Sequence, residues 1–189
     1  MSDLRVKSLV PLPEVLLVEP AVWADRRGYF FEAFTHKYLA HGIGPFVQDN
    51  FSVSHREVLR GLHLQSEPNM QGKLLTVVRG AAFDVVVDVR IGSPTFGLWG
   101  SVWLDETKPV QVWVPAGFAH GFCALDNNTV LQYKTTAPYE PSSEIGIAWN
   151  DVDIGIAWPM ETPTLSDKDR GAPSLRDVRD RLPRFVCRI

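Results

Sequence analysis

The residues best suited to chemistry in this chain are two histidines that stand among cationic side chains. His63 follows Arg60 closely and precedes Lys73, and His120 lies in a later, glycine-flanked segment. A neutral imidazole, with an ordinary pKa near about 6.5, can accept a proton near neutral pH, while a nearby lysine or arginine can offset negative charge that develops on an oxygen. These residue types predict proton abstraction next to a carbonyl group.

A tyrosine can supply the complementary acid. If residues 129–136 form a strand, alternate side chains share one face, so Leu131, Tyr133 and Thr135 point the same way. We expect Tyr133 to face an interior, where a phenol can donate a proton to an enolate carbon. The spacing alone also fits a core tyrosine with a satisfied hydroxyl group, and His63 and His120 also fit structural hydrogen bonds.

Short strands are expected to position these side chains. Between Lys73 and Thr136 apolar stretches alternate with turn residues, which is typical of a sandwich or barrel. The sequence predicts a meandering antiparallel arrangement. Arg60 is expected to share a strand face with Leu62. The expected strands cover residues 83–90, 98–104, 110–114, 120–125 and 129–136, with an apolar face in the first at Phe83, Val85, Val87 and Val89, and an inward face in the third at Val110, Val112 and Val114.

Helices are expected to be few, short and peripheral. Thr35 can cap a helix that ends at Gly42, and Ser174 with Asp177 can open another that stops before Pro183. No linker or internal repeat separates these segments, so the chain is expected to form a single domain over residues 1–189.

The composition narrows the class of protein. With 189 residues and 45% hydrophobic content the chain can bury a core without disulfides. A net charge of -3 argues against a nucleic-acid or anionic-membrane partner but leaves room for a basic pocket that binds a phosphorylated small molecule. The two cysteines, Cys123 and Cys187, and the absence of an apolar leader favour a cytoplasmic location, and no apolar run approaches the roughly 20 residues of a membrane span.

Two other kinds of active site are poorly supported. Metal sites of cupin barrels usually contain a His-x-His pair, but Leu64 and Gln65 follow His63, so no bound metal is expected. The Gly-x-Ser-x-Gly elbow of serine hydrolases is absent as well.

A set of ordered motifs resembles a known family over most of the chain. The motifs are segments 25–32, 48–50, 58–63, 71–73, 83–88, 93–97, 115–122, 133–136 and 165–169. Together they resemble the dTDP-4-dehydrorhamnose 3,5-epimerases of nucleotide-sugar biosynthesis. The resemblance implies a double-stranded β-helix, which is a cupin-like jelly roll, assembled as a homodimer that uses no cofactor. The implied substrate is dTDP-4-dehydro-6-deoxy-D-glucose, whose C3 and C5 are inverted through an enolate.

The resemblance also implies roles for particular residues. His63 would be the general base, Asp169 its orienting partner and Tyr133 the general acid, while Lys73 would hold the enolate oxygen with the substrate-binding His120 nearby. Without that resemblance, Asp169 would be interpreted as part of a solvated charge run. Other matches to substrate-contacting positions, some of which can serve the partner subunit, are Arg27, Glu32, Gln48, Asp49, Asn50, Arg60, Glu144 and Lys168, with Tyr139 stacking on the nucleotide base.

Three alternatives remain open at this level. Relatives that invert only one carbon, or that act on other nucleotide deoxysugars, keep much the same motifs, and Leu64 stands where an aromatic residue is frequent. A non-catalytic module that binds nucleotide sugars would tolerate loss of the acid or the base. A metal-dependent oxygenase of the same fold is disfavoured by the missing His-x-His pair.

Overall fold

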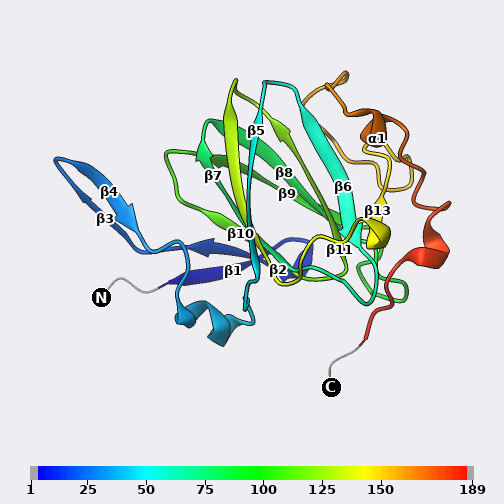
Figure 1. Ribbon diagram of the computed structural model, residues 1–189, viewed down its shortest axis with the longest axis horizontal. Helices are drawn as coiled ribbons and strands as arrows, with labels where there is room; N and C mark the ends of the chain where they lie inside the picture. The colour runs from blue at the N-terminus through cyan, green and yellow to red at the C-terminus, as the bar shows by residue number, and fades with distance from the viewer. Residues whose placement is uncertain (1–3, 187–189) are drawn as a thin grey trace.

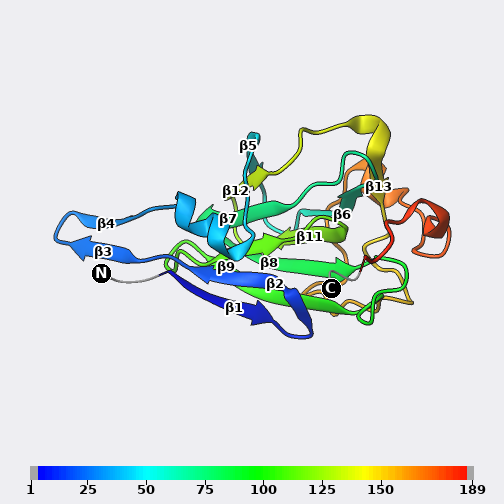
Figure 2. The same cartoon turned by 90° about the horizontal axis from the view of Figure 1, so that it is seen from below.

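The computed structural model describes residues 4–186, which form two β-sheets, a separate hairpin and a few short helices (Figures 1 and 2). The larger sheet contains, in spatial order, β1 (Arg5–Leu9), β2 (Leu12–Glu19), β10 (Gln111–Val114), β7 (Lys73–Arg79), β12 (Thr129–Thr135) and β5 (Gln48–Ser54). The smaller sheet contains β13 (Glu144–Gly146), β6 (Leu59–Gln65), β11 (Phe118–Ala124), β8 (Ala81–Asp88) and β9 (Trp99–Asp105). The predicted all-β jelly roll is thereby confirmed.

The strand order corrects the prediction of a meander. The strands are antiparallel, as expected, but β10 pairs with β2 and β7, and β11 pairs with β6 and β8. The chain therefore crosses repeatedly from one sheet to the other instead of pairing each strand with the next. The prediction was wrong because alternation of apolar residues shows which face of a strand is buried, but not which strand lies beside it.

Inward-facing side chains of both sheets form the first hydrophobic cluster. It joins Leu75 of β7 and Leu131 of β12 in the larger sheet to Val86 of β8 and Phe118 of β11 in the smaller one. Val112 and Val114 of β10 belong to it too, and Val110, just before the strand, packs against it, which confirms the inward face predicted for this segment. Tyr133 packs against the edge of this cluster and so faces the interior, as expected.

Both faces of β8 are buried, which explains its dense run of valines. Val85 and Val87 belong to a second hydrophobic cluster, on the outer face of the smaller sheet, together with Ile145 of β13 and Leu175 of the C-terminal segment. The alternate residues, including Asp84, turn inward with Val86. An acidic residue therefore lies fully buried inside the barrel.

The helices are short and peripheral, as predicted. A 3-10 helix, η1 (His36–His41), begins after Thr35, whose hydroxyl group accepts a hydrogen bond from the Lys37 amide, and ends at Gly42. The other helices are η2 (Pro141–Ser143), α1 (Asp167–Arg170) and η3 (Arg179–Arg181). The helix expected to open at Ser174 is shorter than predicted: Ser174 and Asp177 bond to each other in a turn, and only η3 follows before Pro183.

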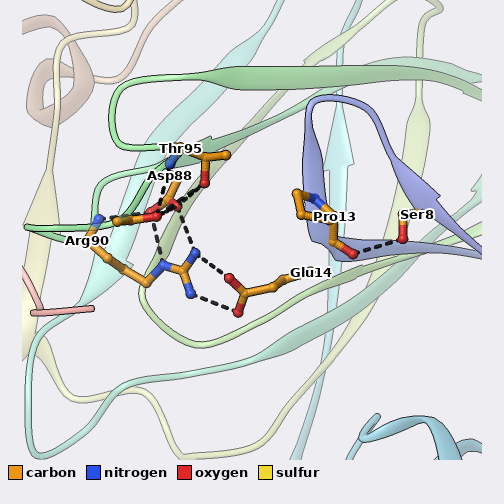
Figure 3. A network of polar contacts seen from close by, with 7 residues as sticks. Ser8, Pro13, Glu14, Asp88, Arg90 and Thr95 are labelled. Carbon is orange, nitrogen blue, oxygen red and sulfur yellow. Dashed lines mark hydrogen bonds and ion pairs between the residues drawn. The ribbon is translucent and has the colours of Figure 1, made fainter. Parts of the chain in front are cut away.

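An ion network of the buried residues Asp88 and Arg90 with the exposed Glu14 ties β8 to β2 (Figure 3). The Arg90 guanidinium donates to both carboxylate oxygens of Asp88, at 2.9 and 2.7 Å, and to both of Glu14, at 2.8 and 2.7 Å. It also lies 4.0 Å from the ring centre of Phe118 and 5.0 Å from that of Phe185. Charge-assisted, bidentate bonds of this kind fix both partners in position. Through its contact with Phe185, Arg90 also joins the barrel to the C-terminal segment.

The hairpin of β3 (Val22–Asp25) and β4 (Gly28–Phe31) extends away from both sheets, on the side opposite the C-terminal segment (Figures 1 and 2). Trp23, Tyr29 and Phe30 on this hairpin are exposed. Among residues 4–186, no helix has the length and apolar character needed to span a membrane. Cys123 is free and buried, while Cys187 lies outside the described residues.

Candidate active site

His63 and Tyr133 face one cavity from opposite sheets. His63 lies on β6 of the smaller sheet and Tyr133 on β12 of the larger sheet. The cavity that they share has a volume of about 610 Å³, within the range of about 300–1,000 Å³ usual for small-molecule sites. Its other lining residues include Arg60, Lys73, His120, Phe122, Leu131, Ser166, Lys168 and Asp169.

His63 forms a close pair with Asp169. The Nε2 atom of His63 lies 2.6 Å from Oδ1 of Asp169, although 106 positions separate the two residues in the sequence. Asp169 is in α1, where Ser166 caps the helix: its hydroxyl group accepts from the Asp169 amide and donates to Oδ2 at 2.9 Å. The cap thus holds the Asp169 carboxylate next to the imidazole. In the sequence, residues 166–170 look like a solvated run of charges, but Asp169 among them is buried.

The pair also fixes the tautomer of the neutral His63 ring. Burial raises the pKa of the Asp169 carboxyl group, but the hydrogen bonds and charges of His63, Ser166 and Lys168 outweigh burial and leave the pKa below its usual range. An ionised carboxylate only accepts hydrogen bonds, so Nε2 of His63 carries the hydrogen. The lone pair of a neutral imidazole is then on Nδ1, which makes Nδ1 the basic atom.

A second histidine–aspartate pair stands on the same wall of the cavity. Nε2 of His120 lies 2.7 Å from Oδ2 of Asp84, whose side chain is fully buried and whose Oδ1 atom has no hydrogen-bond partner among the described residues. Residue type predicts His120 from the sequence, whereas Asp84 was not among the predicted site residues. An acidic residue inside a run of buried valines was the available signal, because a buried charge requires a partner.

Lys73 begins β7 and approaches the same space. Its Nζ atom donates to the carbonyl oxygen of His63 at 3.4 Å. Burial lowers the pKa of Lys73 to about 8, and the charges of Glu144 and Asp84 only partly oppose this effect. Burial likewise raises the pKa of Tyr133, with Arg60 acting in the opposite direction, so the phenol holds its proton across the neutral range.

A bulge at Gly61 explains how Arg60 and His63 both line the cavity. His63 pairs with His120, whereas Arg60 pairs with Phe122, so β6 has one more residue than β11 in this interval. The expectation that Arg60 shares a face with Leu62 was therefore wrong, because the extra residue reverses the alternation. Leu62 packs in the second, outer cluster, while Arg60 lines the cavity and donates from Nε to Ser54 at 3.1 Å.

A smaller pocket of about 310 Å³ adjoins the cavity and shares His63, Lys73 and Tyr133 with it. Tyr139 and Glu144 line this pocket, and the Tyr139 hydroxyl group donates to Oε2 of Glu144 at 2.7 Å. The same oxygen pairs with Lys168, which lines the larger cavity. The hydrogen bonds to Lys168 and Tyr139 outweigh burial and lower the pKa of Glu144.

The three predicted substrate-contacting residues of β5 point to opposite faces of the sheet in alternation. Gln48 and Asn50 of β5 line the smaller pocket, and the Gln48 amide donates to the Asn50 side chain at 2.7 Å. Asp49 lies between them in the sequence and lines neither pocket. It pairs with Lys134 at 2.6 Å, a cross-strand neighbour on the opposite face of the sheet.

Arg27 and Glu32 also lie outside both pockets. Arg27 is at the turn of the β3–β4 hairpin, where its guanidinium donates to Asp25 at 2.6 Å, and Glu32 follows β4. Within residues 4–186, no group of three or more histidine, cysteine, aspartate or glutamate side chains is arranged to hold a metal ion.

Comparison with known proteins gives consistent matches. A family model described as dTDP-4-dehydrorhamnose 3,5-epimerase matches residues 10–177. A dTDP-4-dehydrorhamnose 3,5-epimerase of Sinorhizobium fredii is 50% identical over 182 residues, covering 94% of this chain and 93% of that protein.

Solved structures show the same likeness. A dTDP-6-deoxy-D-glucose-3,5-epimerase of Legionella pneumophila, in complex with dTDP-4-keto-L-rhamnose, superposes with a TM-score of 0.93 at 43% identity, covering 98% of this chain and 100% of that chain. A 3'-monoepimerase of Streptomyces bikiniensis, in complex with dTDP-quinovose, has a TM-score of 0.88 at 38% identity, covering 94% of this chain and 92% of that chain.

Proposed function

Because the chain belongs to the dTDP-4-dehydrorhamnose 3,5-epimerase family, we propose that it inverts C3 and C5 of dTDP-4-dehydro-6-deoxy-D-glucose. The product is dTDP-4-dehydro-L-rhamnose. Members of this family are carbohydrate epimerases, and the chain is accordingly an isomerase. The main support for the mechanism is that His63 and Tyr133 face one cavity from opposite sheets.

The first step is removal of a proton from the carbon next to the C4 carbonyl group. Nδ1 of His63 takes the proton, and the electron pair of the broken C–H bond moves through C4 to its oxygen, which gives an enolate. His63 becomes an imidazolium, and the Asp169 carboxylate at 2.6 Å stabilises its positive charge. Asp169 thus acts on the sugar through His63.

Cationic groups stabilise the enolate. The Lys73 ammonium carries a positive charge below its pKa of about 8 and lies in the wall of the cavity together with His120. Groups fixed in advance around a developing oxyanion commonly contribute most to the rate, because they need not reorganise during the reaction. Arg60 and Lys168 also line this cavity, and we assign them to the diphosphate.

The second step returns a proton from the other face. The Tyr133 phenol donates its proton to the carbon while the enolate collapses to the ketone, so the carbon is inverted and Tyr133 becomes a phenolate. Exchange with water removes the proton from His63 and restores the one on Tyr133. Repetition at the second carbon completes the reaction, and no electron is gained or lost.

The smaller pocket is assigned to the nucleotide. Tyr139 lies at its edge with an exposed fraction of 51%, which leaves the ring available to stack on a base. Gln48, Asn50 and Glu144 provide amide and carboxylate groups next to it.

We also propose a homodimer in which the β3–β4 hairpin reaches the partner's pocket. Arg27 and Glu32 match substrate-contacting positions but lie outside the pockets of their own chain. The exposed aromatic residues of the hairpin support this assignment, since large exposed apolar groups commonly mark an interface. Asp49 lies on the outer face of the larger sheet and also lines neither pocket, so we assign it to the partner's site as well. No nucleic-acid or membrane partner is proposed, and the cytoplasmic location stays a prediction.

Incubation with dTDP-4-dehydro-6-deoxy-D-glucose in deuterated water tests the proposed function. We expect deuterium at both C3 and C5 of the product. Deuterium at one carbon alone would identify a single-carbon epimerase like the Streptomyces bikiniensis relative. Binding of the substrate without any deuterium uptake would indicate a non-catalytic binding module.

A further inference from the structure

The segment that carries Tyr139 is held by side chains from other parts of the barrel. This segment, residues 137–140, connects β12 to η2 and has no strand of its own. A connecting loop of this kind usually has a mobile, solvated backbone. Here, however, each of its four residues has a backbone group bound by a glutamine side chain.

Gln65 holds the residues on either side of Tyr139. It is the last residue of β6 and has an exposed fraction of 4%. Its Nε2 atom donates to the carbonyl oxygen of Pro138 at 3.2 Å and to that of Asn69 at 2.6 Å, and its Oε1 atom accepts from the Glu140 amide at 2.7 Å. One buried amide group therefore binds the chain immediately before and immediately after Tyr139.

Two other glutamines complete the attachment. The Tyr139 amide donates to Oε1 of Gln48 at 3.0 Å, and Nε2 of Gln71 donates to the carbonyl oxygen of Ala137 at 2.6 Å. Gln65 makes the largest number of these bonds and uses both of its amide hydrogens.

The position of the Tyr139 ring is thus set before any nucleotide arrives. Its backbone is fixed by Gln65 and Gln48, and its hydroxyl group is fixed by Glu144 at 2.7 Å. Ordering a loop and an aromatic ring during binding weakens affinity, and an ordered free state avoids that cost. Loss of the attachment is therefore expected to appear in binding of the nucleotide rather than in the chemical step.

We infer that Gln65 is a positioning residue that presents Tyr139 to the nucleotide base and thereby sets the affinity for the dTDP part of the substrate. The inference rests on the proposed function, in which Tyr139 stacks on the base. Gln65 does not act on the reacting carbons, because its amide group is engaged with the backbone on both sides of Tyr139.

The test uses Gln65→Glu and Gln65→Met in the full-length protein. The glutamate variant keeps the shape but loses both N–H donors, and the methionine variant keeps the length without hydrogen bonds or charge. Hydrogen exchange is expected to quicken at the amides of Tyr139 and Glu140, which follow the proline of this segment, and the Kd for dTDP to rise roughly tenfold, since binding must then order the loop. The KM of the sugar nucleotide should rise by a similar factor, with kcat nearly unchanged.

Thr76→Val provides the matched control. It removes one buried bond from a side chain to a backbone carbonyl, Oγ1 to Val110 at 3.0 Å, on the face of β7 that points away from Lys73. General loosening of the barrel would affect this variant and the Gln65 variants alike. The inference requires that only the Gln65 variants change dTDP affinity.

A double-mutant cycle with Tyr139→Ala separates the two proposals. If Gln65 acts through Tyr139, the Gln65 substitution adds little to the loss of dTDP affinity once Tyr139 is an alanine. Additive losses, or unchanged exchange at the amides of Tyr139 and Glu140, would overturn the inference about Gln65. If Tyr139→Ala alone leaves dTDP affinity unchanged, the stacking role in the proposed function is wrong. The inference that Gln65 sets dTDP affinity through Tyr139 is then wrong as well.

Discussion

At the scale of single residues, the site depends on pairs that the sequence shows only in part. His63, Lys73, His120 and Tyr133 were all chosen from residue type and strand alternation, and all four line one cavity. Their partners were harder to predict. The resemblance supplied Asp169, and nothing in the spacing of Gln65 suggested its attachment to residues 138 and 140. Such contacts arise from the folding of distant segments, which one sequence does not reveal.

Asp169→Asn should abolish most of the exchange catalysed by His63. The amide group of asparagine can donate to Nε2, which shifts the imidazole hydrogen to Nδ1 and removes the basic lone pair. We expect proton abstraction to slow by roughly 10²–10⁴-fold, measured as the rate of deuterium uptake into the substrate. Asp177→Asn is the control, because Asp177 is exposed and bonds to Ser174 in a turn that lines neither pocket. Uptake at the wild-type rate in Asp169→Asn would show that the pair is not needed for basicity.

Activity should fall as the pH rises through about 8, the pKa to which burial lowers Lys73. The charged ammonium is the form that holds the enolate, and it is present below this pKa and lost above it. The measurement is the pH profile of kcat/KM. Lys73→Arg keeps its charge throughout this range because guanidinium does not deprotonate, so its residual activity should lack the fall near pH 8. The same fall in the arginine variant would assign the titration to another group.

At the scale of secondary-structure elements, the sequence predicted which faces are buried better than which strands pair. Alternation in 83–90 and 110–114 placed the apolar faces correctly, and Thr35 and Gly42 marked the ends of η1. The pairing order and the bulge in β6 were not foreseen. Both depend on backbone contacts between segments far apart in the sequence, for which side-chain periodicity carries no signal.

Gly61→Ala should distort the bulge that aligns Arg60 with His63. Gly61 has a φ of +120°, and a Cβ atom there would lie 2.6 Å from Cα of Gly121 and 2.7 Å from the carbonyl oxygen of His120. We expect unfolding free energy to fall by about 2 kcal/mol or more, measured by denaturant titration. Gly92→Ala is the control, because Gly92 has a positive φ of +88° but nothing within 4 Å of a Cβ atom. Equal losses in the two variants would mean that β11 does not restrict this position.

At the scale of the whole molecule, two opposing sheets place the base and the acid on either side of one space. The jelly roll was expected from the resemblance and is confirmed. That residues 1–189 form one domain stays a prediction. The homodimer is also a prediction, and it is the feature that would explain why Arg27 and Glu32 lie outside both pockets of their own chain.

Complementation between inactive variants tests the homodimer. If the hairpin serves the partner's pocket, dimers formed by co-expressing Arg27→Ala with His63→Asn contain one complete site: the Arg27→Ala subunit keeps His63 and receives Arg27 from its partner. Activity should therefore return to a substantial fraction. Co-expression of His63→Asn with Tyr133→Phe leaves a defect in every pocket and should restore nothing. Failure of the first pair to recover, in dimers verified to be mixed, would place Arg27 in its own subunit's site or outside any site.

The assignment of base and acid is tested by following deuterium uptake and the configuration of the sugar together in deuterated water. In the Tyr133→Phe variant we expect His63 to remove the proton still and to return a deuteron to the same face, so that recovered substrate is labelled without inversion. His63→Asn should give neither label nor inversion. Labelled, inverted product formed by Tyr133→Phe at the wild-type rate would contradict the assignment of base and acid to the two opposing sheets.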